Sequence, residues 1–276
     1  MTFSPSDNFD LDSYDISLDY LSGDWQIYQL KEGHRFSTDD VLTAAYAIEN
    51  MPRTPSNILD LGSGIGSVGM MLAWYWRQAH IMGVEAQLLS VKLANQSLAV
   101  NALQERVQFV YADFRDYIWP NKTKGFDLVT GSPPYLPANE GTISNHLQKA
   151  YCRFELRGGV EEYCIAAART MAPDGYFSLV FGARWVPRVI SAAKNAGLRI
   201  VRWRNILPRT DKEALLSLFW MQHGTMETEP EPDSDLIVRN ASDERTPEMI
   251  RTRSLLGMPN HSRKKGPLHD EATHKH

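Results

Sequence analysis

The hydrophobic pattern along the middle of the chain alternates between short apolar runs and longer amphipathic stretches. Buried β-strands are indicated by five apolar runs, at residues 57–61, 80–85, 107–111, 126–131 and 176–181. Helices are indicated by stretches with helical spacing at about 38–50, 67–77, 87–103, 159–171 and 186–196. This alternation predicts an α/β fold with a mostly parallel, doubly wound sheet. Residues 198–207 and 215–221 are expected to pair as antiparallel strands at its edge.

The two ends of the chain have a different composition from the middle. Residues 1–24 contain six aspartates and no basic residue, which predicts a flexible acidic arm. The main domain is expected over residues 25–223, beginning with a short strand at 26–30. Residues 224–258 are expected to form a C-terminal extension that packs on or near this domain, with a strand at 235–239 and a helix at 247–256. Residues 259–276 are polar and predict a disordered tail.

Composition excludes several classes of protein. The chain has 276 residues, 43% of them hydrophobic, which is enough for one large buried core. No apolar run approaches the roughly 20 residues that cross a bilayer, and the acidic N-terminus lacks the basic charge of a leader. We therefore predict a cytoplasmic protein without a membrane partner. Cys152, Cys164 and the histidines match no metal-ligand spacing, so no metal is expected.

A glycine-rich turn, Gly62-Ser-Gly-Ile-Gly66, follows the first strand of the alternating region. Its spacing is G-x-G-x-G, whereas dinucleotide-binding proteins have G-x-G-x-x-G. Acidic residues surround it: Asp60 precedes the glycines, and Glu85 and Asp113 end the next two strands. Carboxylates disfavour a pyrophosphate and favour a ligand with an ammonium group, hydroxyls and an amine. S-adenosylmethionine is such a ligand, with Glu85 accepting from ribose hydroxyls and Asp113 from an amino group.

Two further features belong to the same predicted edge of the sheet. Ser37 and Asp40 have the spacing of a capping box at the start of the helix at 38–50, where free amides and the Thr38 hydroxyl can hold a carboxylate. The strand at 126–131 ends in Ser132-Pro-Pro-Tyr135. Two adjacent prolines force the chain out of the sheet, because neither can donate a hydrogen bond to a neighbouring strand. Ser132 and the proline carbonyls can then accept hydrogen bonds from a planar amine, and Tyr135 can stack on its ring.

Together these motifs resemble the class I S-adenosylmethionine-dependent amino-methyltransferases. The resemblance rests on Asp60-Leu-Gly-Ser-Gly-Ile-Gly66, Glu85, Ala112-Asp113 and Ser132-Pro-Pro-Tyr135. With Gly33-His-Arg-Phe-Ser-Thr-Asp-Asp40 before the first strand, the chain is similar to the bacterial tRNA adenine-N6-methyltransferases that act beside the anticodon of a valine tRNA. The resemblance covers about residues 26–256. It implies a Rossmann-like fold with a seven-stranded sheet, S-adenosylmethionine as cofactor and an RNA substrate, with tRNA expected.

The resemblance also implies roles for individual residues. The cofactor-binding residues would be Thr38, Asp39, Asp60, Gly62, Gly64, Gly66, Glu85, Asp113 and Phe114, with Phe114 against the adenine ring. Residues 132–135 would be catalytic: Ser132, Pro133, Pro134 and Tyr135. Ser132 stands where this family usually has asparagine. Because serine there is more typical of cytosine-N4 DNA methyltransferases, a cytosine or DNA target stays open. A protein glutamine-N5 methyltransferase and a non-catalytic scaffold are further alternatives.

Basic residues after the Pro-Pro loop are candidates for contacts with RNA phosphates. The polar run at 137–146 predicts a mobile lid, and Lys149, Arg153, Arg157 and Arg184 follow it. Further along the chain the candidates are Arg188, Lys194, Arg199, Arg202, Arg204 and Arg209. A net charge of −4 argues against non-specific coating of nucleic acid but leaves room for such a local basic face.

Overall fold

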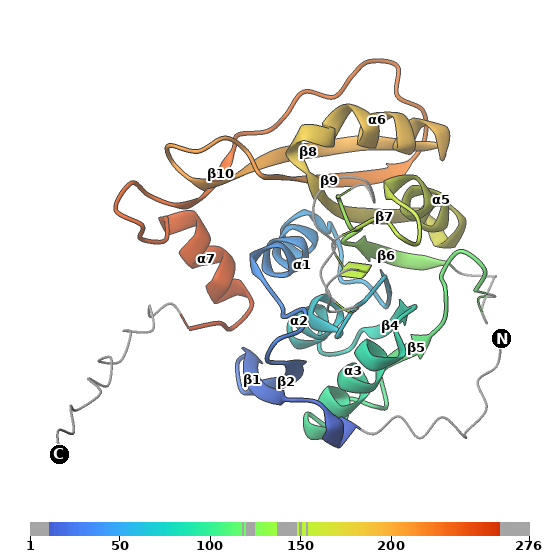
Figure 1. Ribbon diagram of the computed structural model, residues 1–276. Helices are drawn as coiled ribbons and strands as arrows, with labels where there is room; N and C mark the ends of the chain where they lie inside the picture. The colour runs from blue at the N-terminus through green and yellow to red at the C-terminus, as the bar shows by residue number, and fades with distance from the viewer. Residues whose placement is uncertain are drawn as a thin grey trace.

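Two layers of helices cover the two faces of a central β-sheet (Figure 1). The computed structural model describes residues 11–117, 119, 125–136, 148, 151–152 and 154–259. The predicted lid at 137–146 and the candidates Lys149 and Arg153 lie outside these described residues. Alternate residues of a central strand enter different cores: Ile58 packs with the helices of one face, whereas Leu59 packs with those of the other.

Five parallel strands form the part of the sheet that the alternating pattern predicts. They are β3 (Asn57–Leu61), β4 (His80–Glu85), β5 (Val107–Tyr111), β6 (Phe126–Gly131) and β7 (Met171–Gly182). In space their order is β5-β4-β3-β6-β7. The helices of this region are α1 (Thr38–Asn50), α2 (Ser67–Tyr75), α3 (Leu88–Val100) and α5 (Val160–Thr170). The first three contribute to one core and α5 to the other.

Beyond β7 the sheet continues with three more strands. β9 (Leu216–His223) pairs antiparallel with both β7 and β8 (Leu198–Arg209), and β10 (Leu236–Arg239) pairs parallel with β8. The short helix η2 (Ala183–Trp185) and α6 (Val186–Asn195) connect β7 to β8. The expected α/β sheet with antiparallel pairing is confirmed. Its strand number is eight rather than seven, because the C-terminal extension supplies β10 and so makes β10 the edge strand.

The N-terminal region differs from the flexible arm predicted over residues 1–24. After the short helix η1 (Leu11–Ser13), strand β1 (Ile16–Ser22) pairs antiparallel with β2 (Trp25–Leu30). Aspartates disfavour strands, but Asp19 gains hydrogen bonds from Ser17, Gln29 and Arg35 that offset this cost. Leu21 and Ile27 are buried in the core beside α2, which anchors the pair.

The C-terminal extension packs against the same side of the molecule. Helix α7 (Pro247–Leu255) contacts α1, and the Arg204 guanidinium of β8 forms an ion pair with Glu248 at 2.8 Å. The turn after α7 places Gly257 against the Trp74 ring. Gly23 of the β1–β2 turn lies against the same ring, and its N–H donates to the Gly257 carbonyl at 3.1 Å. Among the described residues, no helix is long and apolar enough to cross a membrane.

Candidate active site

The topology of the sheet determines where a ligand can enter. From β3 the chain continues to β4 and β5 on one side, and then returns to place β6 and β7 on the other. In open α/β sheets the crevice at such a switch, at the carboxyl ends of the strands, is where ligands bind. A cavity of about 490 Å³ lies at that point between the loops that follow β3, β4 and β6. The start of α1 closes one of its sides.

The glycine-rich loop after β3 forms one wall of this cavity. Gly62 and Gly64 have φ of +61° and +55°, a conformation that residues with a Cβ rarely adopt. A Cβ on Gly62 would overlap the Tyr163 hydroxyl, whereas a Cβ on Gly64 would have no atom within 4 Å. Gly64 therefore presents bare backbone to open space, and a ligand can approach it closely.

Glu85 at the end of β4 holds this loop from the other side. One carboxylate oxygen accepts from the Gly64 N–H at 2.9 Å, and the other accepts from the Gln87 N–H at 2.7 Å. Burial raises the pKa of Glu85 although these bonds oppose the shift. Each oxygen retains a lone pair, so the carboxylate can also accept from a ligand in the cavity.

Asp60, the residue two positions before Gly62, lies beneath the loop. Its Oδ1 accepts from the Thr130 hydroxyl of β6 at 2.7 Å. Burial raises the pKa of Asp60 to about 7, while the hydrogen bond from Thr130 and the nearby Gly69 N–H work in the opposite direction. Near neutral pH this group is therefore balanced between its charged and neutral forms.

The first turn of α1 adds two more carboxylates. The predicted capping box is present: the Ser37 N–H donates to the Asp40 carboxylate at 2.8 Å. Asp40 is buried, and burial together with the charge of Asp39 raises its pKa well above the usual range. Thr38 and Asp39 are more exposed and also line the cavity.

Three buried oxygen atoms on the cavity lining have no hydrogen-bond partner within the described part of the chain. They are Asp60 Oδ2, Ser63 Oγ and Ser132 Oγ. Burying such atoms unpaired is costly unless a ligand or water completes them. Because they accept hydrogen bonds and carboxylates surround them, the cavity suits a cationic ligand rich in N–H and O–H donors. These residues fit S-adenosylmethionine, which carries a sulfonium, an ammonium group and ribose hydroxyls.

The Ser132-Pro133-Pro134-Tyr135 loop forms the wall opposite the α1 turn. All four residues line the cavity. The Tyr135 carbonyl accepts from the Trp185 indole N–H at 3.2 Å, and the Tyr135 ring meets Phe181 edge-on with centroids 6.4 Å apart. Neighbouring elements thus hold the loop in place while the Ser132 hydroxyl remains without a partner among the described residues.

The cavity brings together most of the residues predicted from the sequence, but not all. On its lining are Thr38, Asp39, Asp60, Gly62, Gly64, Glu85 and residues 132–135. Gly66, Asp113 and Phe114 lie off the lining. Asp113 is engaged by the Arg115 guanidinium, whose hydrogen bond lowers its pKa, and Phe114 packs on Tyr163 with ring centroids 4.6 Å apart. A Cβ on Gly66 would overlap the Phe109 ring, so that glycine serves close packing.

Six of the predicted phosphate contacts fall into two groups. Arg157 and Arg184 are exposed; Arg157 donates to the Ala86 carbonyl and lies 4.2 Å over the Tyr151 ring, and Arg184 lies over Trp185. Four others form ion pairs within the fold: Arg188 with Glu155 and Glu161, Arg202 with Asp233, Arg204 with Glu248 and Arg209 with Asp211. Because their charges are already compensated, the structure does not favour these four as phosphate contacts.

Sequence reasoning missed several residues of the cavity. Asp40 was identified only as a helix cap, although an acid beside Asp39 at the start of α1 was a detectable signal. Tyr163, Cys152 and Gln87 also line the cavity. No sequence motif marks Tyr163 and Cys152, because their position depends on how α5 and the segment before it pack, whereas Gln87 follows the predicted Glu85 by two residues. Burial raises the pKa of the Cys152 thiol to about 12, which makes it a poor nucleophile.

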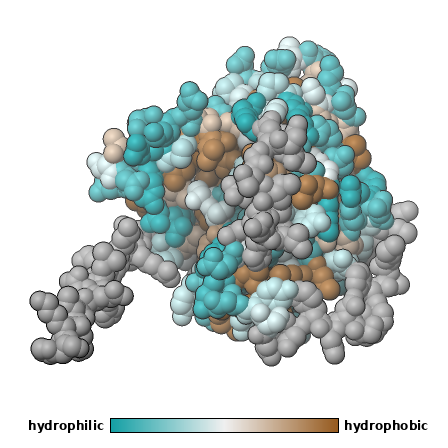
Figure 2. Space-filling view, in the orientation of Figure 1, coloured by the Kyte–Doolittle hydropathy of each residue, from teal (hydrophilic) through white to brown (hydrophobic). Residues whose placement is uncertain are grey.

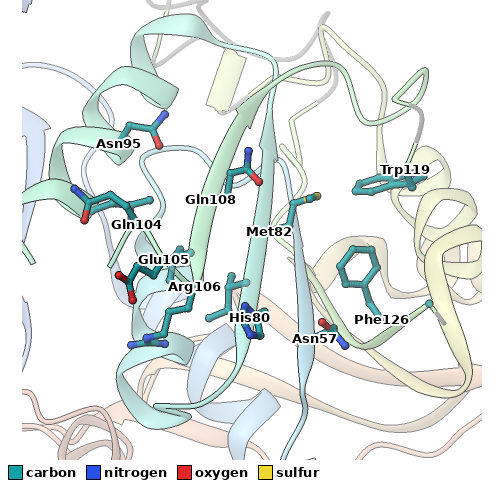
Figure 3. A pocket seen from close by; sticks show the side chains of 14 residues that line it. Asn57, His80, Met82, Asn95, Gln104, Glu105, Arg106, Gln108, Trp119 and Phe126 are labelled. Atoms are coloured by element: carbon teal, nitrogen blue, oxygen red, sulfur yellow. The ribbon is translucent and has the colours of Figure 1, made fainter. Parts of the chain in front are cut away.

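A larger cavity, of about 750 Å³, lies at the opposite edge of the sheet (Figure 3). It is lined at the amino ends of the strands by Asn57, His80 and Phe126, with Trp119 facing Phe126. Figure 3 shows Met82 and Gln108 between this aromatic pair and the polar turn at 104–106. It contains neither the glycine loop nor the carboxylates, so volume alone does not identify the site. Among the described residues, no cluster of three His, Cys, Asp or Glu side chains could hold a metal.

Comparison with known proteins defines the class. Residues 31–158 match the family model of the methyltransferase small domain, which spans the glycine loop and the Pro-Pro loop. A predicted O-methyltransferase from Agrobacterium tumefaciens has the same fold, with a TM-score of 0.60 at 20% identity over 80% of this chain and 97% of that one. The chain is an S-adenosylmethionine-dependent methyltransferase with the class I methyltransferase fold.

Curated relatives carry a narrower name. The chain is 27% identical to a tRNA1(Val) (adenine(37)-N6)-methyltransferase of Vibrio cholerae over 68% of this chain and 75% of that protein. It is 25% identical to an enzyme of the same name from Porphyromonas gingivalis, over 79% of this chain and 86% of that protein. The resemblance identified from the motifs is thereby confirmed.

Proposed function

We propose that this methyltransferase modifies the exocyclic N6 amine of an adenine in RNA, with tRNA as the substrate. The observation that carries the proposal is the buried Ser132 hydroxyl, which has no hydrogen-bond partner among the described residues and begins a Pro-Pro-Tyr loop in an acidic cavity. A planar amine can receive the methyl group and at the same time donate a hydrogen bond to this hydroxyl oxygen. The names of the curated relatives support adenine and tRNA as the particular target.

Orientation of the amine is the main catalytic task of the loop. The lone pair of an exocyclic amine is delocalised into its ring, so the amine is a poor nucleophile. A hydrogen bond from one of its protons to Ser132 Oγ turns the amine and directs the lone pair away from the loop. Tyr135 stacks against the base and excludes water, a contact worth about 1–3 kcal/mol.

The acidic half of the cavity holds the cofactor. Bound there, S-adenosylmethionine supplies an activated methyl group on a positively charged sulfur. Asp39 and Asp60 would balance the positive charges, Glu85 would accept from the ribose hydroxyls, and the bare backbone at Gly64 would allow close contact. No strong general base is required, since the methylated amine is a strong acid that loses its proton to water.

The acceptor base must leave its stack before Tyr135 can cover it. Unpairing costs a few kcal/mol in a duplex and much less in a loop. Single-stranded loop nucleotides are therefore the preferred substrates, which agrees with an RNA rather than a duplex DNA target.

One observation favours a second target. Ser132 stands where the resembled family has asparagine, and serine is more typical of enzymes that methylate the N4 amine of cytosine. Both amines are planar and exocyclic, so the loop geometry is compatible with either.

Nucleoside analysis distinguishes these targets. Purified enzyme is incubated with labelled S-adenosylmethionine and, in parallel, with total tRNA or with a protein fraction, and the digested RNA is separated. We expect label in N6-methyladenosine. Label in N4-methylcytidine would replace the adenine target, label in a protein fraction alone would favour glutamine methylation, and no label with cofactor bound would favour a non-catalytic scaffold.

A further inference from the structure

A groove of about 550 Å³ lies directly beside the candidate active site. It is bounded by the start of α1, the turn between β8 and β9, and β10. Three residues, Thr38, Leu215 and Leu216, line both this groove and the cofactor cavity, so the two spaces adjoin. Figure 2 shows apolar residues gathered in a hollow beside β10.

The strand order indicates which part of a substrate reaches this groove. Two carboxylates of the cofactor cavity, Asp60 and Glu85, lie at the ends of β3 and β4, and the loop at residues 132–135 follows β6. When the target amine is bound at Ser132, the cofactor therefore lies on the side of β3 and β4. The rest of the substrate must extend away from it, towards β7, β9, β8 and β10. The turn after β8 and the end of β10 lie at the same edge of the sheet as Ser132, because both strands run parallel to β6.

The groove has an apolar floor. Leu42, Ile206, Pro208, Leu216 and Val238 form it, and Leu215 at the boundary with the cofactor cavity is 60% exposed. A leucine this exposed beside a cavity gains free energy when a flat apolar surface covers it. A nucleobase offers such a surface.

The rim of the groove is basic. Arg209, Lys212 and Arg239 stand against two carboxylates, Asp211 and Asp243, which pair with the arginines at 2.5 and 3.5 Å. Lys212 forms no ion pair with any residue that the structure describes. Of the three cations that line the groove, Lys212 is thus the one without an ion pair in the described part of the chain, and an RNA phosphate is a group that can bind it.

We propose that this groove binds the nucleotide adjacent to the target base, with its base on the apolar floor and its phosphate at Lys212. The proposal rests on the function proposed above. It gives the C-terminal extension a role, since β10 contributes Val238 and Arg239 to the groove.

Substrates that lack one base test the proposal. Short oligoribonucleotides of the same sequence carry either a normal or an abasic nucleotide on each side of the target adenosine. We expect one of the two abasic substitutions to raise the KM of the natural enzyme about tenfold, in line with the loss of one stacked base. Failure of both substitutions to change the KM would overturn the proposal.

Variants then locate the effect. Val238→Asp should raise the KM for the normal substrate about tenfold and abolish the preference over the abasic one, with cofactor affinity unchanged. Val201→Asp is the matched control, because Val201 is an exposed valine of the adjacent strand β8 outside the groove. An equal effect of both variants, or a preference that survives Val238→Asp, would contradict the proposal.

A substitution of Lys212 provides a second, independent test, because this residue lies in the turn between β8 and β9 and not in a strand. Lys212→Ala should raise the KM several-fold and reduce the salt dependence of RNA binding by about one phosphate contact, and Lys212→Arg should restore both. An unchanged salt dependence would exclude Lys212 as a phosphate contact. If the natural enzyme transfers no methyl group to RNA at all, the proposed function fails rather than the groove alone.

Discussion

Asp60 is a residue whose chemistry depends strongly on its surroundings. It has one oxygen on the Thr130 hydroxyl and the other, without a partner among the described residues, at the cavity. Its pKa of about 7 means that protons compete with a cationic ligand for the same carboxylate near neutral pH. The cavity therefore becomes more negative as the pH rises through about 7.

Cofactor binding should therefore release a proton. Because a bound cation favours the ionised carboxylate, affinity for S-adenosylmethionine should rise as the pH increases through about 7. Calorimetry in two buffers of different ionisation enthalpy measures the proton released. Asp60→Asn should abolish both the release and the pH dependence. Thr130→Val should move the midpoint upwards by about one pH unit, because the hydrogen bond that lowers the pKa is lost.

The ligand-free protein should show the opposite trend in stability. A carboxyl whose pKa is raised by folding contributes stability below its unfolded pKa, near 4, and loses it as the pH rises through the folded value. The free energy of unfolding should thus decrease between about pH 4 and 7 relative to Asp60→Asn. An equal slope for both proteins would show that Asp60 is not the group responsible.

Ser132 should affect the rate of transfer more than binding of the cofactor. Ser132→Ala removes the hydroxyl expected to orient the acceptor amine, and we expect kcat to fall about 10- to 100-fold, the value of a hydrogen bond in a buried site. The affinity for S-adenosylmethionine should change less than twofold. A parallel loss in both quantities would mean that Ser132 holds the cofactor instead.

Residue types with a special backbone or charge were the ones predictable from the sequence. Gly62 and Gly64 were identified because glycine is favoured in tight turns with positive φ, and Asp60 and Glu85 because acids stand just before the glycine loop and at the end of the next strand. The ion pairs that compensate Arg188 or Arg204 could not be predicted, since their partners are distant in the chain. Tyr163 enters the cavity only through the packing of α5.

The β1–β2 pair is the element that supports the entrance to α1. Gln29 of β2 accepts from the Phe36 N–H at 3.1 Å, and Asp19 of β1 pairs with Arg35 at 2.9 Å. Burial alone would raise the pKa of Asp19, but hydrogen bonds from Ser17, Gln29 and Arg35 hold it below its usual value. These contacts position the segment that leads to Thr38 and Asp39.

Removing this support should loosen the cofactor cavity from a distance. Asp19→Ala should lower the free energy of unfolding by about 1–3 kcal/mol, the cost of leaving its hydrogen-bond donors unpaired, and weaken cofactor affinity several-fold. Asp15→Ala is the control, because Asp15 forms an exposed ion pair with Lys31 that is worth about 0–1 kcal/mol. Equal effects in thermal unfolding would contradict a special role for Asp19.

Strong periodicity explains which elements were predicted well. The helix over Thr38–Asn50 and the strands over Asn57–Leu61, His80–Glu85 and Phe126–Gly131 have the predicted bounds. Strand β1 was missed because its alternation is interrupted by aspartate, whose partner Arg35 lies outside the strand. The strand at the end of the chain was predicted, but not that it would join the main sheet, because pairing depends on the position of β8.

At the scale of the whole molecule, Trp74 joins two segments that are far apart in the sequence. Gly23 of the β1–β2 turn and Gly257 after α7 both lie against its ring, and both have positive φ. A hydrogen bond between their backbones links the two glycines directly, so the N-terminal and C-terminal segments are held together on this ring.

Substitution at this contact should destabilise the whole fold. A Cβ on Gly257 would overlap the Trp74 ring, so Gly257→Ala should cost about 2–4 kcal/mol of unfolding free energy. Gly197→Ala is the control, because Gly197 also has a positive φ, +73°, but open space around the added Cβ. It should cost only about 1 kcal/mol. Denaturant unfolding of the two variants separates the cost of overlap with the Trp74 ring from the cost of backbone strain. Equal losses of unfolding free energy would show that the contact with Trp74 adds no cost of its own.

The order of strands along the carboxyl edge has a consequence for how such enzymes change over evolution. Groups expected to hold the methyl donor lie at the ends of β3 and β4 and at the start of α1, whereas most of the groove proposed for the neighbouring nucleotide comes from the last third of the chain. Apart from Leu215 and Leu216, which line both spaces, residues after β7 can therefore change the fit of the neighbouring nucleotide without touching the cofactor cavity. A lineage can thus alter its preference for the sequence around the target base mainly through the last third of its gene.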